Sequence, residues 1–264
     1  MFPLKKTMLK KAQLTLFIIL GIMMLMITAF LIHFKGAAQE GNLQPETQKF
    51  AEADLSPENV KDFVNRCIRN TAETGIYIIA RNGGYVMPEN KTEGRVKAAY
   101  FGYGGGNVYP SAETVREEIS SYVASNLFFC TQNFNEFRNR GWNITDGSMN
   151  VTAVFTDDGA DFTADYPLAL EKNDLKMDLN GFHASAKGMR ISFLYDIAAD
   201  IAKSQADSDD FDVGYFERLG RENNVTIDMA AADAAEDSSM IFFIEDPASG
   251  FKDRQFVFRF AVKG

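Results

Sequence analysis

Two cysteines and two histidines are the residues of this sequence best suited to nucleophilic or acid-base chemistry: Cys67, Cys130, His33 and His183. Neither cysteine has the sequence signature of an activating base beside it, so a catalytic thiolate is disfavoured. Because His33 lies in an apolar run, His183 alone remains as an imidazole base for a hydrolase. A single histidine in the setting Gly-Phe-His-Ala is more typical of a surface or strand residue. A glycosidase with paired carboxylates stays open, since their separation is not visible in a sequence.

Two segments resemble ligand-binding loops but lack the required spacing. The acidic run from Asp207 to Gly214 does not place its carboxylates and glycine as an EF-hand loop does, which favours a solvated loop. The glycine-rich run from Tyr100 to Asn107 has no strand directly before it and no Lys-Ser or Lys-Thr after it, which disfavours a phosphate-binding loop. We expect neither a metal site nor a cofactor.

Aromatic residues in and beside the glycine-rich run form a candidate contact for a partner: Tyr100, Phe101, Tyr103 and Tyr109. Rings of this kind pack on the surface of their own domain or meet another protein. Both interpretations remain open from the sequence.

The cellular localisation is indicated by an apolar stretch without an ionised side chain, which begins at Leu14 and ends at Phe34. At about 1.5 Å per residue, a helix of this length crosses a hydrocarbon core about 30 Å thick. The stretch follows four lysines, Lys5, Lys6, Lys10 and Lys11. The positive-inside rule therefore predicts a single-pass protein with residues 1–13 in the cytoplasm, a transmembrane helix over 14–34 in contact with the lipid bilayer, and the remainder outside the cell membrane.

Two alternatives to an uncleaved anchor remain. Small residues at Gly36-Ala37-Ala38 suit a cleaved secretory signal, although the apolar stretch exceeds the usual length of about 7 to 15 residues. The run Lys10-Lys11-Ala12-Gln13 resembles the class III signal of archaeal type IV pilins, in which cleavage leaves a glutamine at the new N-terminus. Pilins of that type usually carry a glutamate five residues into the mature chain, where this sequence has Phe17.

The composition indicates a folded domain beyond the span. Hydrophobic residues make up 46% of the chain and include 23 phenylalanines, which argues against a disordered stalk. The formal net charge of −9 disfavours nucleic acid as a partner. A polar linker over 35–55 is expected to precede a single composite ectodomain over 56–264.

The first part of the ectodomain has helical periodicity. Ser56, Pro57 and Glu58 supply a side-chain cap, a preset φ and a favourable charge for a helix start, and apolar residues then recur every three or four positions as far as Ala72. The segment from Ile76 to Ile79 is either a strand or a continuation of this helix. A second long helix is predicted from the Ser111 cap to just before Gly141.

Later segments alternate as strands do. A hairpin is predicted around Asp157-Asp158-Gly159, with shorter strands around Asn173-Asp174 and a further strand over 180–187. Helices are expected over 189–206 and near Phe216, followed by three final strands joined through turns at Asp246-Pro247 and Ser249-Gly250. The predicted class is α+β, with two long N-terminal helices and mostly antiparallel sheet in the C-terminal half.

The predicted external position gives two further expectations. Cys67 and Cys130 each fall on the apolar stripe of a predicted helix, and an oxidising compartment favours a disulfide between them over two buried free thiols. Candidate glycosylation sites are the four Asn-X-Ser/Thr sequons at Asn90, Asn143, Asn150 and Asn224.

Several short motifs occur in a familiar order. They are the basic-Ala-Gln-Leu-Thr-Leu-Phe-Ile-Ile-Leu-Gly anchor, Phe63-Val64-x-x-Cys67-Ile68, Gly83-Gly84-Tyr85, Cys130-x-x-Asn133-Phe134, Tyr166-Pro167-Leu168 and the late strands ending near Phe256 to Ala261. With these motifs the chain resembles a family of uncharacterised single-pass, membrane-anchored surface proteins of small-genome archaea. The resemblance implies an anchored surface or envelope protein and no catalytic activity.

The expected function is therefore that of a non-enzymatic, membrane-anchored cell-envelope protein whose ectodomain supports structure or binds a partner. Its expected protein partners are other envelope proteins or copies of itself. The alternatives are a pilin-like filament subunit processed before Gln13 and an extracytoplasmic hydrolase.

Overall fold

The computed structural model describes residues 56–92, 96–205, 211–232 and 239–263. The chain divides into two units, Met1–Asp54 and Leu55–Gly264, and everything described below belongs to the second unit. The predicted cytoplasmic segment, the predicted membrane span over 14–34, the linker and Gln13 lie outside the described residues. Among the helices of the described part, none combines the length and the apolar character that crossing a membrane requires.

The described residues form an α+β fold with mostly antiparallel sheets, which confirms the predicted class. Its helices are α2 (Pro57–Arg81), α3 (Ala112–Thr131), the 3-10 turn η2 (Gln132–Phe134), α4 (Asn135–Arg138), α5 (Ile191–Gln205) and α6 (Val213–Asn223). Its strands are β1 (Tyr100–Tyr103), β2 (Gly106–Asn107), β3 (Asn143–Asp146), β4 (Asn150–Thr156), β5 (Gly159–Asp165), β6 (Leu168–Lys172), β7 (Leu175–Leu179), β8 (Phe182–Lys187), β9 (Thr226–Ala231), β10 (Met240–Phe251) and β11 (Arg254–Lys263).

The strands form three sheets. The largest has the order β2-β1-β11-β10-β9, in which β1 and β11 run parallel and the other neighbours are antiparallel. The other two sheets have the orders β4-β5-β8 and β3-β6-β7. The predicted hairpin at Asp157-Asp158-Gly159 joins β4 to β5, and Asn173, in the left-handed region with φ +54°, lies between β6 and β7 as expected.

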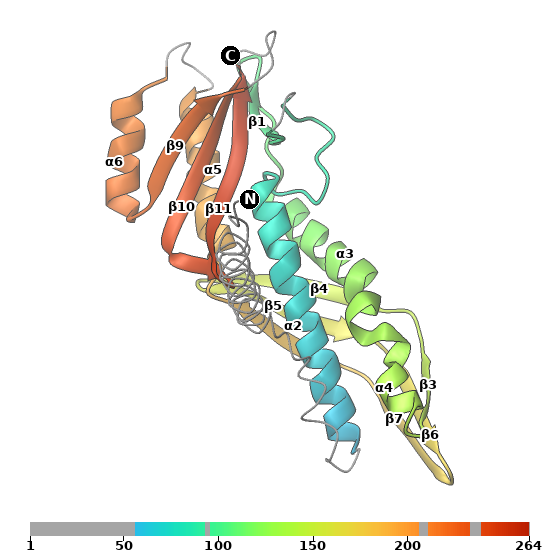
Figure 1. The fold of residues 1–264 in the computed structure, drawn as a ribbon. Helices are drawn as coiled ribbons and strands as arrows, with labels where there is room; N and C mark the ends of the chain where they lie inside the picture. Colours follow the sequence, from blue (N-terminus) through green and yellow to red (C-terminus); the bar gives the residue numbers. More distant parts are fainter. Residues whose placement is uncertain (1–55, 93–95, 206–210, 233–238, 264) are drawn as a thin grey trace, which may run out of the picture. The chain divides into compact units, whose positions relative to one another are not determined.

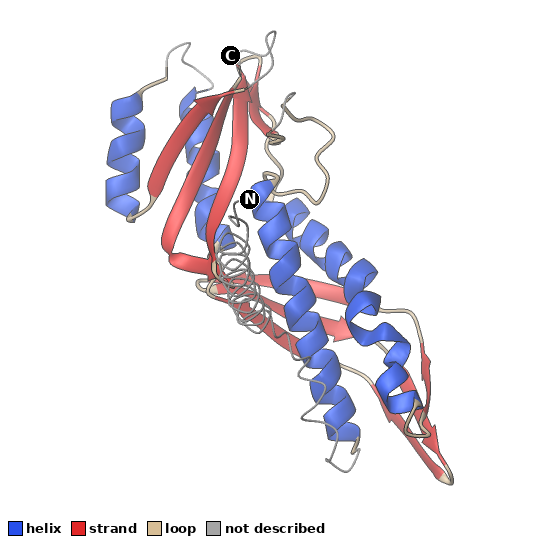
Figure 2. Ribbon diagram, in the orientation of Figure 1, coloured by secondary structure: helices blue, strands red, loops and turns tan. Residues whose placement is uncertain are grey.

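The longer helices pack mainly on two of these sheets, and α4 lies against β3 of the third (Figures 1 and 2). Helices α2 and α3 run side by side against the β4-β5-β8 sheet, while α5 packs on the five-stranded sheet and α6 flanks β9. The C-terminal part of α2 also reaches β11. Helix α2 therefore packs mainly on two sheets and on α3, with a smaller contact to β7 of the third sheet.

Helix α2 starts where the sequence predicts, but its cap differs. Ser56 has the extended backbone of an N-cap and Pro57 is the first helical residue, yet the Ser56 side chain accepts no hydrogen bond from the backbone of the first turn. The Ser56 hydroxyl instead hydrogen-bonds to Glu58 and lowers the pKa of that carboxyl. The start of α2 thus depends on proline and on the acidic residue in its first turn rather than on a side-chain cap.

The segment from Ile76 to Ile79 continues helix α2, which decides between the two interpretations left open by the sequence. Ile76 and Ile79 are fully buried at a spacing of three, as one helical face requires. The helix ends at Asn82, and Gly84 N–H then donates to the Ile79 carbonyl at 2.9 Å. Gly84 makes this closure with φ +89°, which a residue with a Cβ rarely adopts.

The second long helix is shorter than predicted. The Ser111 side chain accepts a hydrogen bond from Thr114 N–H at 3.0 Å, which confirms that cap. The helix then breaks at Gln132, Asn133 and Phe134, which all have positive φ, and the chain resumes as the short α4. The break lets Phe134 and Phe137 both pack around Phe63, at ring-centroid distances of 6.3 and 5.2 Å.

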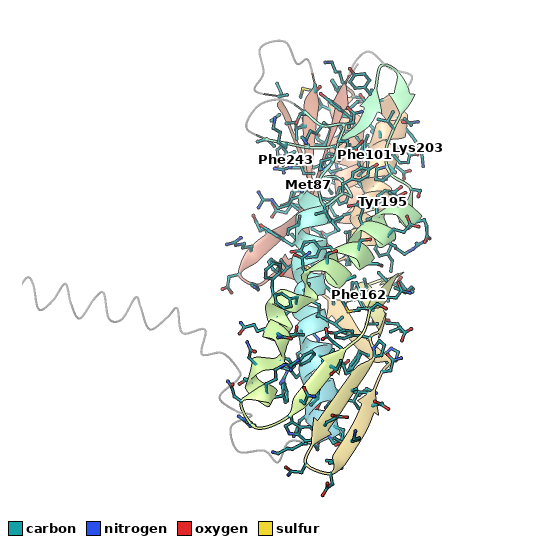
Figure 3. The ribbon with its side chains drawn as sticks, turned by 90° about the vertical axis from the view of Figure 1, so that its right-hand side faces the viewer. Met87, Phe101, Phe162, Tyr195, Lys203 and Phe243 are labelled. Carbon is teal, nitrogen blue, oxygen red and sulfur yellow. A yellow bond between two sulfur atoms is a disulfide. The ribbon has the colours of Figure 1, made fainter. Side chains whose placement is uncertain are left out.

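Phenylalanines dominate the hydrophobic core, in line with their number in the sequence. Eight are almost completely buried: Phe101, Phe134, Phe162, Phe182, Phe242, Phe256, Phe258 and Phe260. Beneath the five-stranded sheet, Phe260 lies 4.8 Å from Phe101 and 5.1 Å from Phe242 between ring centroids. Tyr195 of α5 joins this group and donates its hydroxyl hydrogen to the Pro110 carbonyl at 2.5 Å (Figure 3). Burial raises the pKa of Tyr195 to about 12, so it stays a donor at neutral pH.

The predicted turns at Asp246-Pro247 and Ser249-Gly250 are wrong, because β10 continues through them to Phe251. The register shifts between Glu245 and Gly250, and the chain reverses only after Phe251, where Lys252 has φ +54°. Contacts with the start of α5 hold the bulged segment in place, since Gly250 N–H donates to the Gly188 carbonyl at 2.9 Å.

A buried ion pair joins this bulge to α5. Arg190 donates to both carboxylate oxygens of Asp246, at 2.8 and 2.6 Å, and the Ser249 hydroxyl donates to the same carboxylate. The Asp246 side chain has no exposed surface. Burial alone would raise the pKa of Asp246, but the hydrogen bonds from Arg190, Ser249 and the Ala248 N–H together hold it below its usual value.

Replacing this carboxylate should destabilise the protein strongly. Asp246→Asn leaves Arg190 without its charge partner, and we expect it to reduce the free energy of unfolding by about 3 kcal/mol. The measurement is urea unfolding of the full-length protein in detergent, followed by circular dichroism. Asp200→Asn is the control, because the Asp200–Lys203 pair is exposed and its loss should change stability by less than about 0.5 kcal/mol.

The same pair predicts a pH dependence. Because the folded-state pKa of Asp246 is lowered, the pair stabilises the protein above the unfolded-state pKa of about 4 and loses this contribution as the pH falls through the folded-state pKa. The difference in unfolding free energy between the wild type and Asp246→Asn should therefore narrow below about pH 4. A difference that stays constant down to about pH 2 would contradict this assignment.

Candidate functional site

Cys67 of α2 and Cys130 of α3 form a disulfide, which confirms the predicted pairing. Their Cα atoms are 5.5 Å apart, inside the usual range for such bonds. Cys67 is buried and Cys130 is half-buried. Because both cysteines of the chain are used in this bond, neither is available as a thiolate nucleophile.

The disulfide lies in a helix pair that approaches closely at a second point. A Cβ added to Gly75 of α2 would lie 2.6 Å from a ring carbon of Tyr122 on α3. Any larger residue at Gly75 would require this ring to move. The two helices are therefore joined by a covalent bond at one level and by contact between backbone and ring at another.

The four aromatic residues predicted as a partner contact have different positions. Tyr100 and Phe101 are buried, and Phe101 (labelled in Figure 3) belongs to the phenylalanine core. Tyr109 is half-buried with its ring centroid 5.6 Å from that of Phe101. Tyr103 is 47% exposed. Tyr100 and Phe101 therefore pack in the interior of the fold. For the exposed Tyr103, a contact with a partner remains a prediction.

The glycines between these aromatic residues have a structural role. Gly104 and Gly105 both have positive φ, at +57° and +75°, and reverse the chain between β1 and β2. A two-residue hairpin turn of this kind requires positive φ at both positions, which glycine adopts without strain. The local sequence does not predict these two strands, because β1 pairs with β11, far away in the sequence.

His183 lies in a shallow groove of about 790 Å³ along strand β8. The His183 Nδ1 is 3.3 Å from the Thr163 hydroxyl, and the His183 backbone N–H donates to Asn65 of α2 at 3.0 Å. Ser185, in the same groove, donates its hydroxyl hydrogen to Asp161 at 2.6 Å. These are cross-strand pairs of β5 and β8. The serine is thus bonded to a carboxylate and the histidine to a threonine, which is not the nucleophile-base contact of a serine hydrolase.

The structure describes only part of the acidic run from Asp207 to Gly214. Residues 207–210 lie outside the described residues, and Asp212 caps α6 by accepting a hydrogen bond from Tyr215 N–H at 3.0 Å. Within the described ranges, no three or more His, Cys, Asp or Glu side chains gather as metal ligands would.

All four candidate glycosylation sites have exposed asparagines: Asn90, Asn143, Asn150 and Asn224. Asn143 and Asn150 are the first residues of β3 and β4, and Asn224 follows α6 in the left-handed region with φ +52°. Their exposure is compatible with attached sugars, and modification of these residues remains a prediction.

A second groove, of about 520 Å³, was not predicted. It lies where the end of α2 meets strands β10 and β11, and its lining is Tyr77, Arg81, Phe243, Asp253, Arg254, Gln255, Val257 and Arg259. Three arginines thus gather on a domain of a net acidic chain. No local sequence pattern predicts this groove, because the end of α2 and the strands β10 and β11 are separated by more than half of the sequence.

Comparison of the chain with models of known protein families, with curated proteins and with solved structures finds no match. The class that the described residues define is a disulfide-bonded α+β domain, and the His183 groove and the arginine groove both have charged linings.

Removing the disulfide should lower stability without changing the fold. The bond spans a sequence separation of 63, for which the chain-entropy model gives about 4 kcal/mol. We expect the double variant Cys67→Ala, Cys130→Ala to lose about that much unfolding free energy in urea titrations.

Reductant provides the matched control for this prediction. It should destabilise the wild type toward the level of the double variant and leave the double variant unchanged. Equal stability of the wild type with and without reductant, with thiols shown to be free by alkylation and mass measurement, would contradict a stabilising role of the bond.

Proposed function

We propose that this chain is a membrane-anchored cell-envelope protein with a non-enzymatic extracytoplasmic domain that supports structure or binds a partner. On this proposal the stretch from Leu14 to Phe34 is the single-pass anchor, with its N-terminus in the cytoplasm. The disulfide between Cys67 and Cys130 carries the proposal, because such bonds persist in oxidising compartments and are rare in the cytosol. The basic residues before the apolar stretch support the same orientation.

Exposed aromatic side chains support a partner-binding role. Phe128 and Phe129, next to the disulfide on α3, are 64% and 73% exposed, and their ring centroids are 6.1 Å apart. Aromatic side chains are enriched where proteins meet, since they bury a large apolar area with few rotatable bonds. This pair and Tyr103 are the candidate contacts with other envelope proteins or with a second copy of the chain.

The hydrogen bonds of His183 favour the non-enzymatic proposal over an extracytoplasmic hydrolase. Its ring pairs with Thr163 across the sheet, and its neighbour Ser185 is held by Asp161. A hydrolase that used His183 as its base would need the histidine within reach of the nucleophile.

Protease treatment of intact cells tests the proposed topology. Residues 56–264 should be digested by added protease in intact cells, while a cytoplasmic marker protein stays whole. The readout is an immunoblot with an antibody against the ectodomain, repeated after lysis. An ectodomain that is protected in intact cells and digested only after lysis would refute the proposal.

The mass of the native protein separates the anchor from its alternatives. An uncleaved anchor retains the residues before Gln13. A chain that begins at Gln13 would support the pilin-like filament subunit, and a chain that begins shortly after Ala38 would indicate a secreted protein. Electrospray mass measurement on protein extracted from its native membrane distinguishes these three N-termini.

A further inference from the structure

Guanidinium groups converge on one tyrosine hydroxyl in the groove at the end of α2. Arg81 Nη1 donates to the Tyr77 hydroxyl oxygen at 2.6 Å, and its Cζ lies 5.4 Å from the centroid of the Tyr77 ring. Arg254 of β11 lies near the same hydroxyl and helps to lower its pKa. Arg259, further along β11, donates its Nε hydrogen to the Arg81 carbonyl at 2.7 Å. The neutral Tyr77 hydroxyl oxygen thus accepts from Arg81 and lies near a second guanidinium, that of Arg254, while Arg259 binds the backbone beside them.

Carboxylates of the described residues leave the charges of these arginines largely uncompensated. Among the described residues, none of the three forms an ion pair, and Asp253 is the one acidic side chain in the lining of the groove. Three other described arginines do have acidic partners, in the pairs Arg116–Glu113, Arg190–Asp246 and Arg221–Glu217. The groove therefore carries an excess of two positive charges on a chain whose net charge is negative.

This arrangement is electrostatically unfavourable without an anion. Burial and the neighbouring charge of Arg81 both lower the pKa of Arg259. At Tyr77, burial raises the pKa, but the hydrogen bonds and charges of Arg81 and Arg254 outweigh it and lower the pKa. Both groups therefore lie in a positive potential that a bound anion would neutralise.

The groove is also held in shape before any ligand enters. The Tyr77 ring stacks on Phe251 with ring centroids 4.7 Å apart, and Arg259 is fixed by the carbonyl at the end of α2. Phe243 of β10 (labelled in Figure 3) and Val257 of β11 add apolar lining. The volume of about 520 Å³ exceeds that of a lone inorganic anion and lies in the range of small-molecule sites.

We infer that this groove binds a phosphate monoester, with the phosphate held by Arg81, Arg254 and Arg259 and the organic part placed against Phe243 and Val257. A phosphate monoester carries about 1.5 to 2 negative charges at neutral pH, which matches the charge excess, whereas a single carboxylate carries one. The planar guanidinium forks bind phosphate oxygens in pairs. The inference requires only the described fold and does not depend on the membrane anchor.

Binding measurements on the full-length protein test this site. The protein is kept in a maltoside detergent, which contains no phosphate, and titrated by calorimetry with inorganic phosphate, with glycerol 3-phosphate and with short-chain phosphatidic acid below its micellar concentration. Sodium acetate at equal ionic strength is the reference. We expect saturable binding of the phosphates and none of acetate. Tighter binding of glycerol 3-phosphate than of phosphatidic acid assigns a soluble ligand, and the reverse order assigns a lipid headgroup.

Substitution of Arg254 tests the residues. Arg254 is exposed, so Arg254→Gln should fold normally and weaken binding of glycerol 3-phosphate at least about tenfold, since a hydrogen bond to a charged group is lost. Arg254→Lys keeps the charge but not the fork and should give an intermediate loss. Arg218→Gln is the matched control, because Arg218 is likewise an exposed arginine near a tyrosine, with its Cζ 5.9 Å from the centroid of Tyr215, and it lies outside the groove. It should leave the affinity unchanged.

Two outcomes would overturn the inference. One is the absence of saturable binding for all three phosphates. The other is an equal affinity in Arg254→Gln and in the wild type, with circular dichroism showing that the variant is folded. Both outcomes are independent of the protease experiment, so the phosphate site and the membrane topology can fail separately.

Discussion

The packing of α2 is the constraint on which the rest of the described domain depends. One face of this helix is buried along its whole length, first against α3 and β8 and then against β11. The disulfide fixes α2 to α3 in its first half, and Gly75 allows the Tyr122 ring to approach its backbone further on. Because α2 packs on both β8 and β11, its position decides where Asn65 meets the edge of β8 and where Arg81 meets β11. The His183 groove and the arginine groove are consequently both built on this helix.

The features that the sequence predicts well are those with short-range causes. The apolar stripe of α2, the Ser111 cap and the turn at Asp157-Asp158-Gly159 each depend on residues within a few positions of one another. The disulfide is an exception in distance, but it follows from there being two cysteines on two apolar helical faces.

The features that the sequence does not predict depend on distant partners. Strand β1 is too short and too rich in glycine to be recognised alone, and it exists because β11 pairs with it in parallel. The extension of β10 through Pro247 depends on Arg190, which holds Asp246 inside the bulge. The break after α3 depends on the space around Phe63, which is filled by Phe134 and Phe137. The arginine groove could not be predicted for the same reason, since Arg81 and Arg254 meet only in the folded chain.

The order of strands in the largest sheet has a consequence for how the domain is made. Strand β11, which ends at Lys263, lies between β1 and β10 in the middle of that sheet, although it is the last described element to be synthesised. Until β11 has been synthesised, β1 has no parallel partner and the core lacks the phenylalanines that β11 contributes. The two cysteines, by contrast, are available early. An exported chain would therefore form its disulfide first and complete its largest sheet last, by pairing strands that are far apart in the sequence. Long-range pairing of this kind folds slowly, and the apolar surface that stays exposed meanwhile is available to chaperones.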